Sequence, residues 1–345
     1  MDFKDAQGVT QPCPTSGLCI CPWPPAGQGG DAPSGPIRCG GNGVSVLTGI
    51  LAGLAAGALW GLVFVAPRML PTGPGSYSSV DLTAGRFAVY GLVAALAMLL
   101  GFGRRPGPTM RQALAAAGMS LLGFSGYYLL LVMAIGDAGT AMPSLLIGTI
   151  PLWVMLLGKP PGLRWPALVP GLALTLAGLV LMAATSPPAD TGGGLHFWRG
   201  IGFALLALVS WTAFALVNSA WLKRHPEVNA TDWANWLGMA TGLSALVMWL
   251  AAGSASQVLA GRNDLLQFAL LCLLAGFGST WLATVLWNMA SQRLRASLCG
   301  QLIVSETLFA LLYSFVWDGR WPTPLQWCAG ALFTLGILAS IRAHR

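Results

Sequence analysis

A single carboxylate in the middle of an apolar stretch is the most distinctive chemical feature of the sequence. Glu306 lies about ten residues from either end of the stretch 296–316. An ionisable side chain is costly inside a lipid bilayer, so such a residue is a candidate for function by default. Glu306 could bind an ammonium group, or it could take up and release a proton. The structural alternative is a protonated glutamate that is hydrogen-bonded to neighbouring Ser or Asn side chains.

Polar amides and a hydroxyl lie close to this carboxylate in the sequence. Gln301 and Ser305 precede it and are one turn apart on the same predicted helix. They predict either hydrogen bonds to a zwitterionic substrate or packing bonds between helices. Asn288, near the end of the preceding apolar stretch, could reach the same site. Asn218 and Asn235 are interpreted as cap or loop residues.

Aromatic residues are abundant, with 15 Trp in the chain. Many lie at the ends of apolar stretches, where an interfacial belt is the expected role. Others lie deeper and could line a cavity for apolar, aromatic or cationic solutes. Core packing is the alternative for each of them. The deeper candidates are Trp60, Tyr127, Tyr128, Trp153 with the neighbouring Pro151, Trp211 and Trp281.

Glycine recurs every four residues in the stretch 46–66. Such a stripe lets helices approach closely and slide past each other, so it predicts a packing or moving surface. A dimer face is the alternative. The glycines are Gly49, Gly53, Gly57 and Gly61.

Two charged residues begin the next apolar stretch, 80–102. Arg86 lies about six residues inside it and could pair with Asp81 or extend toward the interface. Asp81 could instead cap the helix. We expect both to have a structural or gating role.

The composition of the chain predicts that the helices carrying these residues lie in a lipid bilayer. The chain has 345 residues, of which 55% are hydrophobic and 8% charged, and its mean hydropathy is +0.68. Soluble domains carry roughly a quarter charged residues. The composition therefore excludes a soluble enzyme and a nucleic-acid binder.

Ten apolar stretches are each long enough, at about 20 residues, to cross a bilayer. Their apolar runs are continuous, which is inconsistent with the alternation of a β-barrel. The sequence therefore predicts an all-α integral membrane protein with ten transmembrane helices. The stretches are 46–66, 80–102, 112–134, 138–158, 166–184, 200–222, 232–252, 265–289, 296–316 and 323–341.

Loop charges predict the orientation. If the N-terminus is cytoplasmic, 13 of the 18 Lys and Arg residues are cytoplasmic, 4 lie on the other side and Arg86 lies within a span. Positive charge is concentrated in cytoplasmic loops, so both termini are predicted to be cytoplasmic. We expect a multi-pass protein of the cell (inner) membrane.

Residues 1–43 differ from the rest, with 7 Pro and 9 Gly. They predict a disordered cytoplasmic tail. The four cysteines of this tail match no standard zinc spacing. No apolar core of a signal peptide precedes residue 44, and a translation start near Val44 or Val46 is a further hypothesis.

The two halves of the chain share spaced residues. Two pairs of residues recur at a shift of 151, and one tripeptide recurs at a shift of 156. Five spans per half is an odd number, so a second copy would enter the membrane from the opposite side. This predicts inverted-topology repeats with a solute site near the midplane. The matches are Trp60 with Trp211, Asp81 with Asp232, and Arg164-Trp165-Pro166 with Arg320-Trp321-Pro322.

These residues carry a resemblance to a known family. The relevant motifs are Ala58-Leu59-Trp60-Gly61 with Phe64, Asp81 with Arg86-Phe87, Ile150-Pro151, and Glu306. Over residues 46–341 the chain resembles the EamA-type, ten-span carriers of the drug/metabolite transporter superfamily. The resemblance implies two EamA-like five-helix repeats, at 44–186 and 198–343. Val169-Pro170-Gly171-Leu172 and Trp287-Asn288 are similar to the amino-acid exporter branch.

The chain departs from the family pattern at three positions. Thr307 stands where the second half usually has proline after Glu306, and Ile150, which is not acidic, precedes the corresponding proline of the first half. Leu237 is the uncharged counterpart of Arg86.

A secondary transporter is the function that these features favour. It would move small metabolites by alternating access and export amino acids or related zwitterionic or cationic solutes. A polytopic membrane enzyme is an alternative, but the three histidines lie near loops or the chain end and no catalytic motif is present. A channel is disfavoured because no filter sequence is visible.

Within the superfamily, a carrier of phosphorylated or nucleotide-sugar solutes stays open, although it should place several bases in the cavity. The predicted partners are a small-molecule solute and the lipid bilayer, with protons as a candidate coupling ion and no nucleic acid. No metal or cofactor is predicted, and both a monomer and a homodimer are compatible with the sequence.

Overall fold

The computed structural model describes residues 3–4, 10–11, 42–65, 69, 77–101, 107–138, 141–160, 163–185, 194–254, 263–319 and 321–344. They fall into two units, Met1–Thr48 and Gly49–Arg345. In the first unit, β1 (Phe3–Lys4) and β2 (Thr10–Gln11) pair antiparallel. The rest of the predicted disordered tail, including its four cysteines, lies outside the described residues up to the start of α1.

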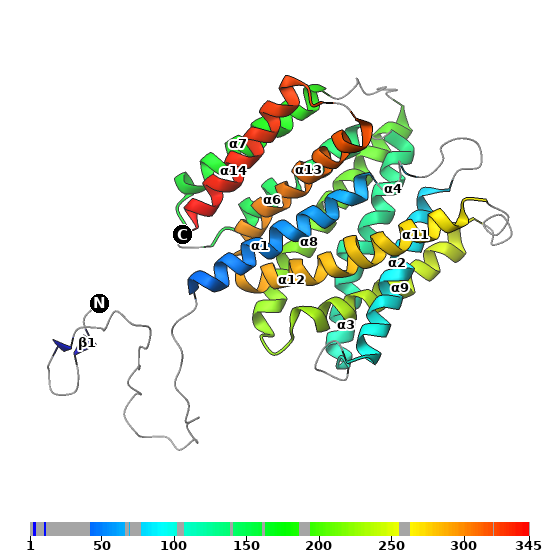
Figure 1. The fold of residues 1–345 in the computed structure, drawn as a ribbon, viewed down its shortest axis with the longest axis horizontal. Coiled ribbons are helices and arrows are strands. Elements are labelled where there is room, and N and C mark those ends of the chain that lie inside the picture. The colour runs from blue at the N-terminus through cyan, green and yellow to red at the C-terminus, as the bar shows by residue number, and fades with distance from the viewer. Residues whose placement is uncertain are drawn as a thin grey trace, which may run out of the picture. The chain divides into compact units, whose positions relative to one another are not determined.

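The second unit is built of helices, as the hydropathy predicts (Figure 1). Among the described residues, eight helical runs are long and apolar enough to cross a membrane. They are α2 (Ser79–Leu99), α3 (Met110–Ser120) continued by η3 (Leu121–Ser125) and α4 (Gly126–Ala138), α7 (Trp165–Thr185), α8 (Leu195–Arg224), α9 (Ala230–Ala252), α11 (Leu265–Gly276) continued by η4 (Phe277–Leu282) and α12 (Ala283–Arg293), α13 (Ala296–Asp318) and α14 (Pro324–Ala343).

Two further predicted stretches form shorter apolar helices. The first is α1 (Asn42–Gly61), followed by the 3₁₀ turn η1 (Leu62–Phe64). The second is interrupted, since one residue, Thr149, separates α5 (Ala141–Gly148) from α6 (Ile150–Leu157). The predicted span 138–158 is therefore not one continuous helix. Pro151, in the first turn of α6, has no N–H to donate and its ring disfavours continuation from the preceding turn.

Helices from distant parts of the chain pack in pairs. In Figure 1, α7 and α14 lie side by side, and α2 crosses near α9. The α2–α9 crossing is close because both helices carry glycine there. A Cβ atom added to Gly91 would lie 2.7 Å from the Cα of Gly242, and one added to Gly242 would lie 2.8 Å from the Cα of Gly91. Such contact between backbones requires residues without side chains at both positions.

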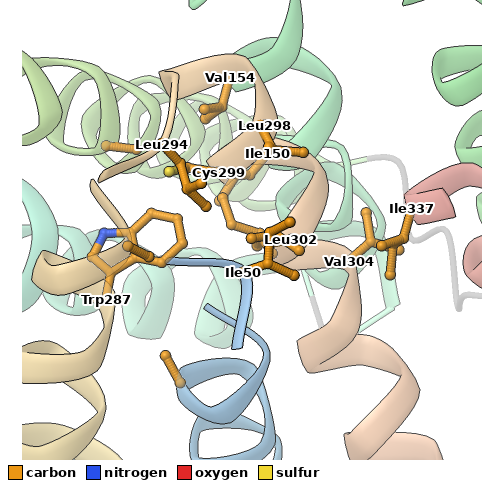
Figure 2. Packing of buried hydrophobic residues seen from close by; sticks show 14 of the residues in the cluster. Ile50, Ile150, Val154, Trp287, Leu294, Leu298, Cys299, Leu302, Val304 and Ile337 are labelled. Atoms are coloured by element: carbon orange, nitrogen blue, oxygen red, sulfur yellow. The ribbon is translucent and has the colours of Figure 1, made fainter. Parts of the chain in front are cut away.

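The largest buried cluster joins six helices around α13. Its members extend from α13 to α1, α6, α8, α12 and α14, and Leu302 is fully buried within it. Figure 2 shows Ile50, Ile150, Val154, Trp287, Leu294, Leu298, Cys299, Leu302, Val304 and Ile337 in this cluster.

Large apolar side chains also cover the outside of the helices. On α9, for example, Leu243, Val247 and Leu250 are all more than half exposed. In water such a surface would drive association, whereas lipid tails cover it at no cost. The protein is therefore an integral membrane protein.

Asp81 acts as a cap and as a link between helix ends. Its side chain accepts a hydrogen bond from the N–H of Ser78, whose hydroxyl accepts one from Asp81 N–H, forming a capping box at the start of α2. The same carboxylate accepts bonds from the N–H and hydroxyl of Ser254, just beyond α9, at 2.8 and 2.7 Å. Of the two expected roles for Asp81, capping is the one observed.

Candidate functional site

A carboxylate and a guanidinium from different helices share one electrostatic environment inside the membrane-spanning region. Glu306 lies on α13 and Arg86 on α2, and both side chains are partly exposed. The two side chains lie within electrostatic range of each other, and the hydroxyl of Tyr127, on α4, lies within range of both, although no hydrogen bond or ion pair joins them among the described residues. We name Arg86, Tyr127, Tyr128 and Glu306 the charged cluster.

Aromatic rings hold the Arg86 side chain. Its guanidinium carbon lies 4.7 Å from the ring centre of Phe87 and 5.5 Å from that of Tyr128. Both distances are within the range of cation–π attraction. The Nε atom of Arg86 is buried and has no hydrogen-bond partner among the described residues. One N–H donor of the charged cluster, Arg86 Nε, therefore has no acceptor in the described part of the chain.

Three tryptophans from three helices meet near α13. Trp60, from α1, has its ring centre 5.3 Å from Trp287 of α12 and 6.3 Å from Trp211 of α8. The rings of Trp211 and Trp287 are also 6.3 Å apart. The indole N–H of Trp287 is buried without a partner among the described residues. Trp60 and Trp211, which the spacing of 151 pairs, are therefore in direct contact.

A continuous series of ring contacts joins the tryptophans to Arg86. Each ring centre is 5.3–6.3 Å from the next, and the last ring stacks under the guanidinium. We name this series the aromatic chain. Its members, in order, are Trp60, Trp287, Trp211, Phe214, Phe124, Phe87 and Tyr128.

Two of the predicted pathway aromatics lie apart from this group. Trp153 is 46% exposed, and its indole N–H donates to the hydroxyl of Thr149 in the preceding turn. Pro151, beside it, is buried. Trp281 donates to the side-chain oxygen of Asn235 at 2.8 Å and stacks on Phe277. None of the three belongs to the aromatic chain.

Gln301 and Ser305 bond to helices rather than pointing to an open site. Gln301 is fully buried, donates to the Thr175 hydroxyl of α7 at 2.9 Å and accepts from the Ser340 hydroxyl of α14 at 3.2 Å. Ser305 is also buried and donates to the carbonyl of Leu302 on its own helix. Both residues therefore have the alternative role expected from the sequence, which is packing and not hydrogen bonding to a substrate.

Buried asparagines link α8, α9 and α12. Asn218 donates to Asn288 at 3.1 Å and accepts from the indole of Trp233 at 2.6 Å, and all three residues are almost fully buried. Assigning Asn218 and Asn235 to caps or loops is wrong, because they lie within α8 and α9 and are fully buried. Asn288 is likewise buried in this network.

The glycine stripe of α1 lies against α13 and the end of α12. Cβ atoms added to Gly53 and Gly61 would fall 2.7 Å from Leu302 and 2.9 Å from the backbone nitrogen of Ala310. Added to Gly49, a Cβ would fall 2.9 Å from Leu294, and at Gly57 it would overlap Ser305. The face predicted for packing is thus covered by the chain itself.

Comparison with known proteins identifies the family. Residues 198–342 match the EamA-like transporter family. The chain is 31% identical to the Inner membrane protein YtfF of Escherichia coli (strain K12) over 318 residues, which cover 86% of this chain and 96% of the relative. The chain is an EamA-type member of the drug/metabolite transporter superfamily. The resemblance predicted from its motifs is confirmed.

Two further comparisons extend this EamA-type assignment. The chain is 26% identical over 283 residues to a probable terminal-alkyne amino-acid exporter of Streptantibioticus cattleyicolor (strain ATCC 35852 / DSM 46488 / JCM 4925 / NBRC 14057 / NRRL 8057), covering 81% of this chain and 88% of the exporter. One crystal structure shares the fold, with a TM-score of 0.69, 21% identity, and coverage of 87% of this chain and 98% of that chain. EamA-type proteins are transporters, and this one is a transporter and not an enzyme.

Sequence reasoning missed four rings of the aromatic chain in this EamA-type carrier, namely Trp287, Phe214, Phe124 and Phe87. Trp287 was not among the predicted site residues, although it connects Trp60 to Trp211. The available signal was its position next to Asn288, in the pair that is similar to the amino-acid exporter branch. Tyr127, Tyr128, Trp60, Trp211 and the two charged residues are the predicted residues that the structure does bring into the charged cluster or the aromatic chain.

Proposed function

We propose that the protein is a secondary carrier that exports amino acids or related zwitterionic or cationic solutes by alternating access. The observation that carries the proposal is the charged cluster, in which Glu306 and Arg86 interact inside the membrane region while both retain partial exposure. Intramembrane charges that keep some access mark solute or ion pathways. The amino-acid exporter relative supports the same substrate class.

We infer ten membrane crossings, and hydrogen bonds between helix ends support the number. Arg199, at the start of α8, binds Asp137, at the end of α4, with two bonds of 2.7 and 2.8 Å. Both ends must then lie on one side of the membrane, which requires an even number of crossings between them. The long helix α7 supplies one crossing, so the broken pair α5–α6 supplies the other.

A second bond leads to the same count. Ser254, after α9, binds Asp81, at the start of α2. The helices from α2 to α9 cross an even number of times only if α5–α6 is included. The glycine contacts of α1 run from Leu294 to Ala310, which corresponds to most of a bilayer-spanning helix at about 1.5 Å per residue. These contacts support α1 as the remaining span.

The two five-helix repeats are supported by equivalent features at the shifts of 151 and 156. Gly91 and Gly242, which touch where α2 meets α9, are 151 residues apart. So are the caps of the two helices, in which Ser78 pairs with Asp81 and Asn229 with Asp232. The π-helical segments η3 and η4 begin 156 residues apart. Segments of this kind are often found at functional sites within helices.

Equivalent helices also pack against each other, as expected for two copies around a pseudo-twofold axis. The pairs α2–α9, α6–α13 and α7–α14 each join one predicted span of residues 44–186 to its counterpart in residues 198–343. Arg86 and Glu306 come from different halves, so rocking of one half against the other would change their separation. This is the movement that alternating access needs.

The inner membrane is the location that we propose, with both termini cytoplasmic. The relative from Escherichia coli is named as an inner membrane protein. The excess of Lys and Arg in the segments assigned to the inside supports the orientation.

Counterflow in proteoliposomes tests the proposed function. The purified protein would be screened against amino acids, amines, nucleosides and sugar phosphates, with and without a pH gradient. Saturable exchange of amino acids or amines is the expected result. Selective exchange of sugar phosphates or nucleotide sugars, or exchange of no solute in any class, would contradict the proposal.

A substitution of the central carboxylate gives the second test. Glu306→Gln keeps the shape of the side chain and removes its charge, so we expect loss of exchange, or loss of any coupling to protons, by at least about tenfold. Insertion and elution in size-exclusion chromatography should match the wild type. Unchanged exchange kinetics in Glu306→Gln would show that the carboxylate has no part in transport.

A further inference from the structure

The Arg86 side chain lies in a membrane-spanning helix, and not all of its hydrogen-bond donors have acceptors among the described residues. Its helix, α2, is one of the membrane-spanning helices, and its Nε atom is buried without a hydrogen-bond partner among the described residues. A guanidinium offers five donors and stays charged at any physiological pH. An unused donor in a region of low dielectric is destabilising unless something with acceptor atoms binds it.

Within the part of the chain that the structure describes, no carboxylate bonds to that donor. Asp81, the nearer acid in the sequence, is occupied by the capping box and by Ser254. Glu306 interacts with Arg86 through its charge, but no ion pair or hydrogen bond joins the two side chains among the described residues. The two opposite charges therefore lie near enough to influence each other but make no direct contact with each other.

Aromatic contacts orient the guanidinium. Phe87 and Tyr128 lie under it at 4.7 and 5.5 Å, so the planar group is held by ring faces instead of by hydrogen bonds. Stacking of this kind leaves the N–H edge available for a planar acceptor, and a carboxylate can accept two parallel bonds from it. The same two rings are the last members of the aromatic chain, which connects them through buried side chains to the three tryptophans.

We propose that Arg86 binds the carboxylate of an α-amino acid while Glu306 binds the ammonium group of the same molecule. This inference rests on the proposed function and assigns the two ends of its substrate. Two opposite charges that are not bonded to each other can each bind one end of a zwitterion, and the partly exposed ring of Tyr128 lies beside the guanidinium. A structural ion pair would bond directly, and a solute with several negative charges would be repelled by Glu306.

Matched solutes test the assignment in the wild-type protein. Phenylalanine, phenethylamine, which lacks the carboxylate, and 3-phenylpropionate, which lacks the ammonium group, would compete with the exchanged radiolabelled amino acid in counterflow. Leucine, isoamylamine and 4-methylpentanoate form a second set. The amino acid should bind about ten- to a hundredfold more tightly than either analogue, as expected for the loss of one charged hydrogen-bonded contact. Equal binding of phenylalanine and phenethylamine would overturn the role of Arg86 without any variant.

Two substitutions should then have opposite effects on selectivity. In Arg86→Met, binding of the amino acid should fall to the level of the amine, and binding of the amine should stay within about twofold of the wild type. In Glu306→Gln, binding of the amino acid should fall to the level of the carboxylic acid. Arg86→Lys keeps the charge and should retain part of the preference. Arg199→Met, which removes an exposed arginine at the start of α8, is the matched control and should keep the wild-type selectivity.

The outcomes separate this inference from the proposed function. Wild-type protein that exchanges no amino acid contradicts both. Amino-acid exchange in which Arg86→Met weakens the amino acid and the amine equally contradicts only the carboxylate assignment and points to a structural arginine. Melting temperatures of all variants in detergent, together with Arg86→Lys, distinguish a loss of selectivity from a loss of folding.

Discussion

Gln301 illustrates how a polar residue in a membrane helix can hold helices together without touching a solute. Its amide is fully buried on α13 and bonds to Thr175 of α7 and Ser340 of α14. Both partners are close to the α7–α14 contact, where Gly171 and Gly336 allow the backbones to approach. The amide therefore links three helices at one point.

Replacing this amide should lower stability and leave substrate affinity unchanged. Gln301→Leu removes both bonds and leaves the two hydroxyls without their partner, at a cost of about 1–3 kcal/mol. We expect a lower melting temperature in detergent and an unchanged half-saturation constant for the molecules that stay folded. Thr334→Val, which removes an exposed hydroxyl of α14, is the control. A weaker affinity with an unchanged melting temperature would instead place Gln301 in the solute site.

Residue types alone were sufficient to find candidate site residues, but they did not distinguish residues that line a solute site from residues that join helices. Glu306 and Arg86 stand out because charge is rare in apolar stretches, and that signal is local. The sequence predicts a cap or loop role for Asn218 and Asn235 because both lie within four residues of the turn-facing end of a predicted span, 200–222 or 232–252. Their partners, Asn288 and Trp281, are 70 and 46 residues away in the chain, so no local pattern could have shown the bonds.

At the scale of elements, the close crossing of α2 and α9 depends on two glycines. A side chain at Gly91 would meet the backbone of Gly242, which cannot move aside as a flexible side chain could. Gly136 of α4 is a matched glycine in a helix that has nothing within 4 Å of an added Cβ. Comparing alanine substitutions at Gly91 and Gly136 therefore separates the effect of the helix contact on stability from the effect of helix propensity.

Gly91→Ala should therefore destabilise the protein, whereas Gly136→Ala should not. Forcing the helices apart costs about 1–3 kcal/mol, while alanine in an uncrowded helix position gains up to about 1 kcal/mol over glycine. Thermal unfolding in detergent would give the comparison, with Gly242→Ala expected to behave like Gly91→Ala. Equal melting temperatures for all three variants would mean that the helices do not depend on this contact.

Hydropathy located the helices better than it located their interruptions. All ten predicted apolar stretches lie on helices, because burial in lipid requires every backbone group to bond within its segment. The break between α5 and α6 could have been expected from Pro151, which lies inside the predicted stretch. The π-helical segments η3 and η4 have no comparable signal, since they contain no proline and differ in sequence.

At the scale of the whole molecule, the hydrogen bonds between helix ends constrain which ends lie on the same side of the membrane. Among the described residues, eight helical runs are long and apolar enough to cross a membrane, and these eight alone would leave Asp137 and Arg199 on opposite sides of it. In the topology that we propose, α5–α6 and α1 also cross the membrane, which gives ten crossings in two sets of five with opposite directions of entry. Arg86 and Glu306 then come from non-equivalent helices of the two proposed halves.

Cysteine labelling in intact and permeabilised spheroplasts tests this topology directly. In a chain with its native cysteines replaced, Gly194→Cys and Trp321→Cys should react with a charged maleimide from outside. Gly107→Cys and Glu227→Cys should react only after permeabilisation, and so should an N-terminal epitope with its antibody. The positions 107 and 194 are decisive, because three crossings separate them if α5–α6 spans the bilayer and two if it does not. Leu250→Cys, on the apolar outside of α9, is the control and should stay unlabelled in both preparations. Labelling of positions 107 and 194 from the same side would contradict the topology, because the two halves would then have unequal numbers of spans and could not be inverted repeats.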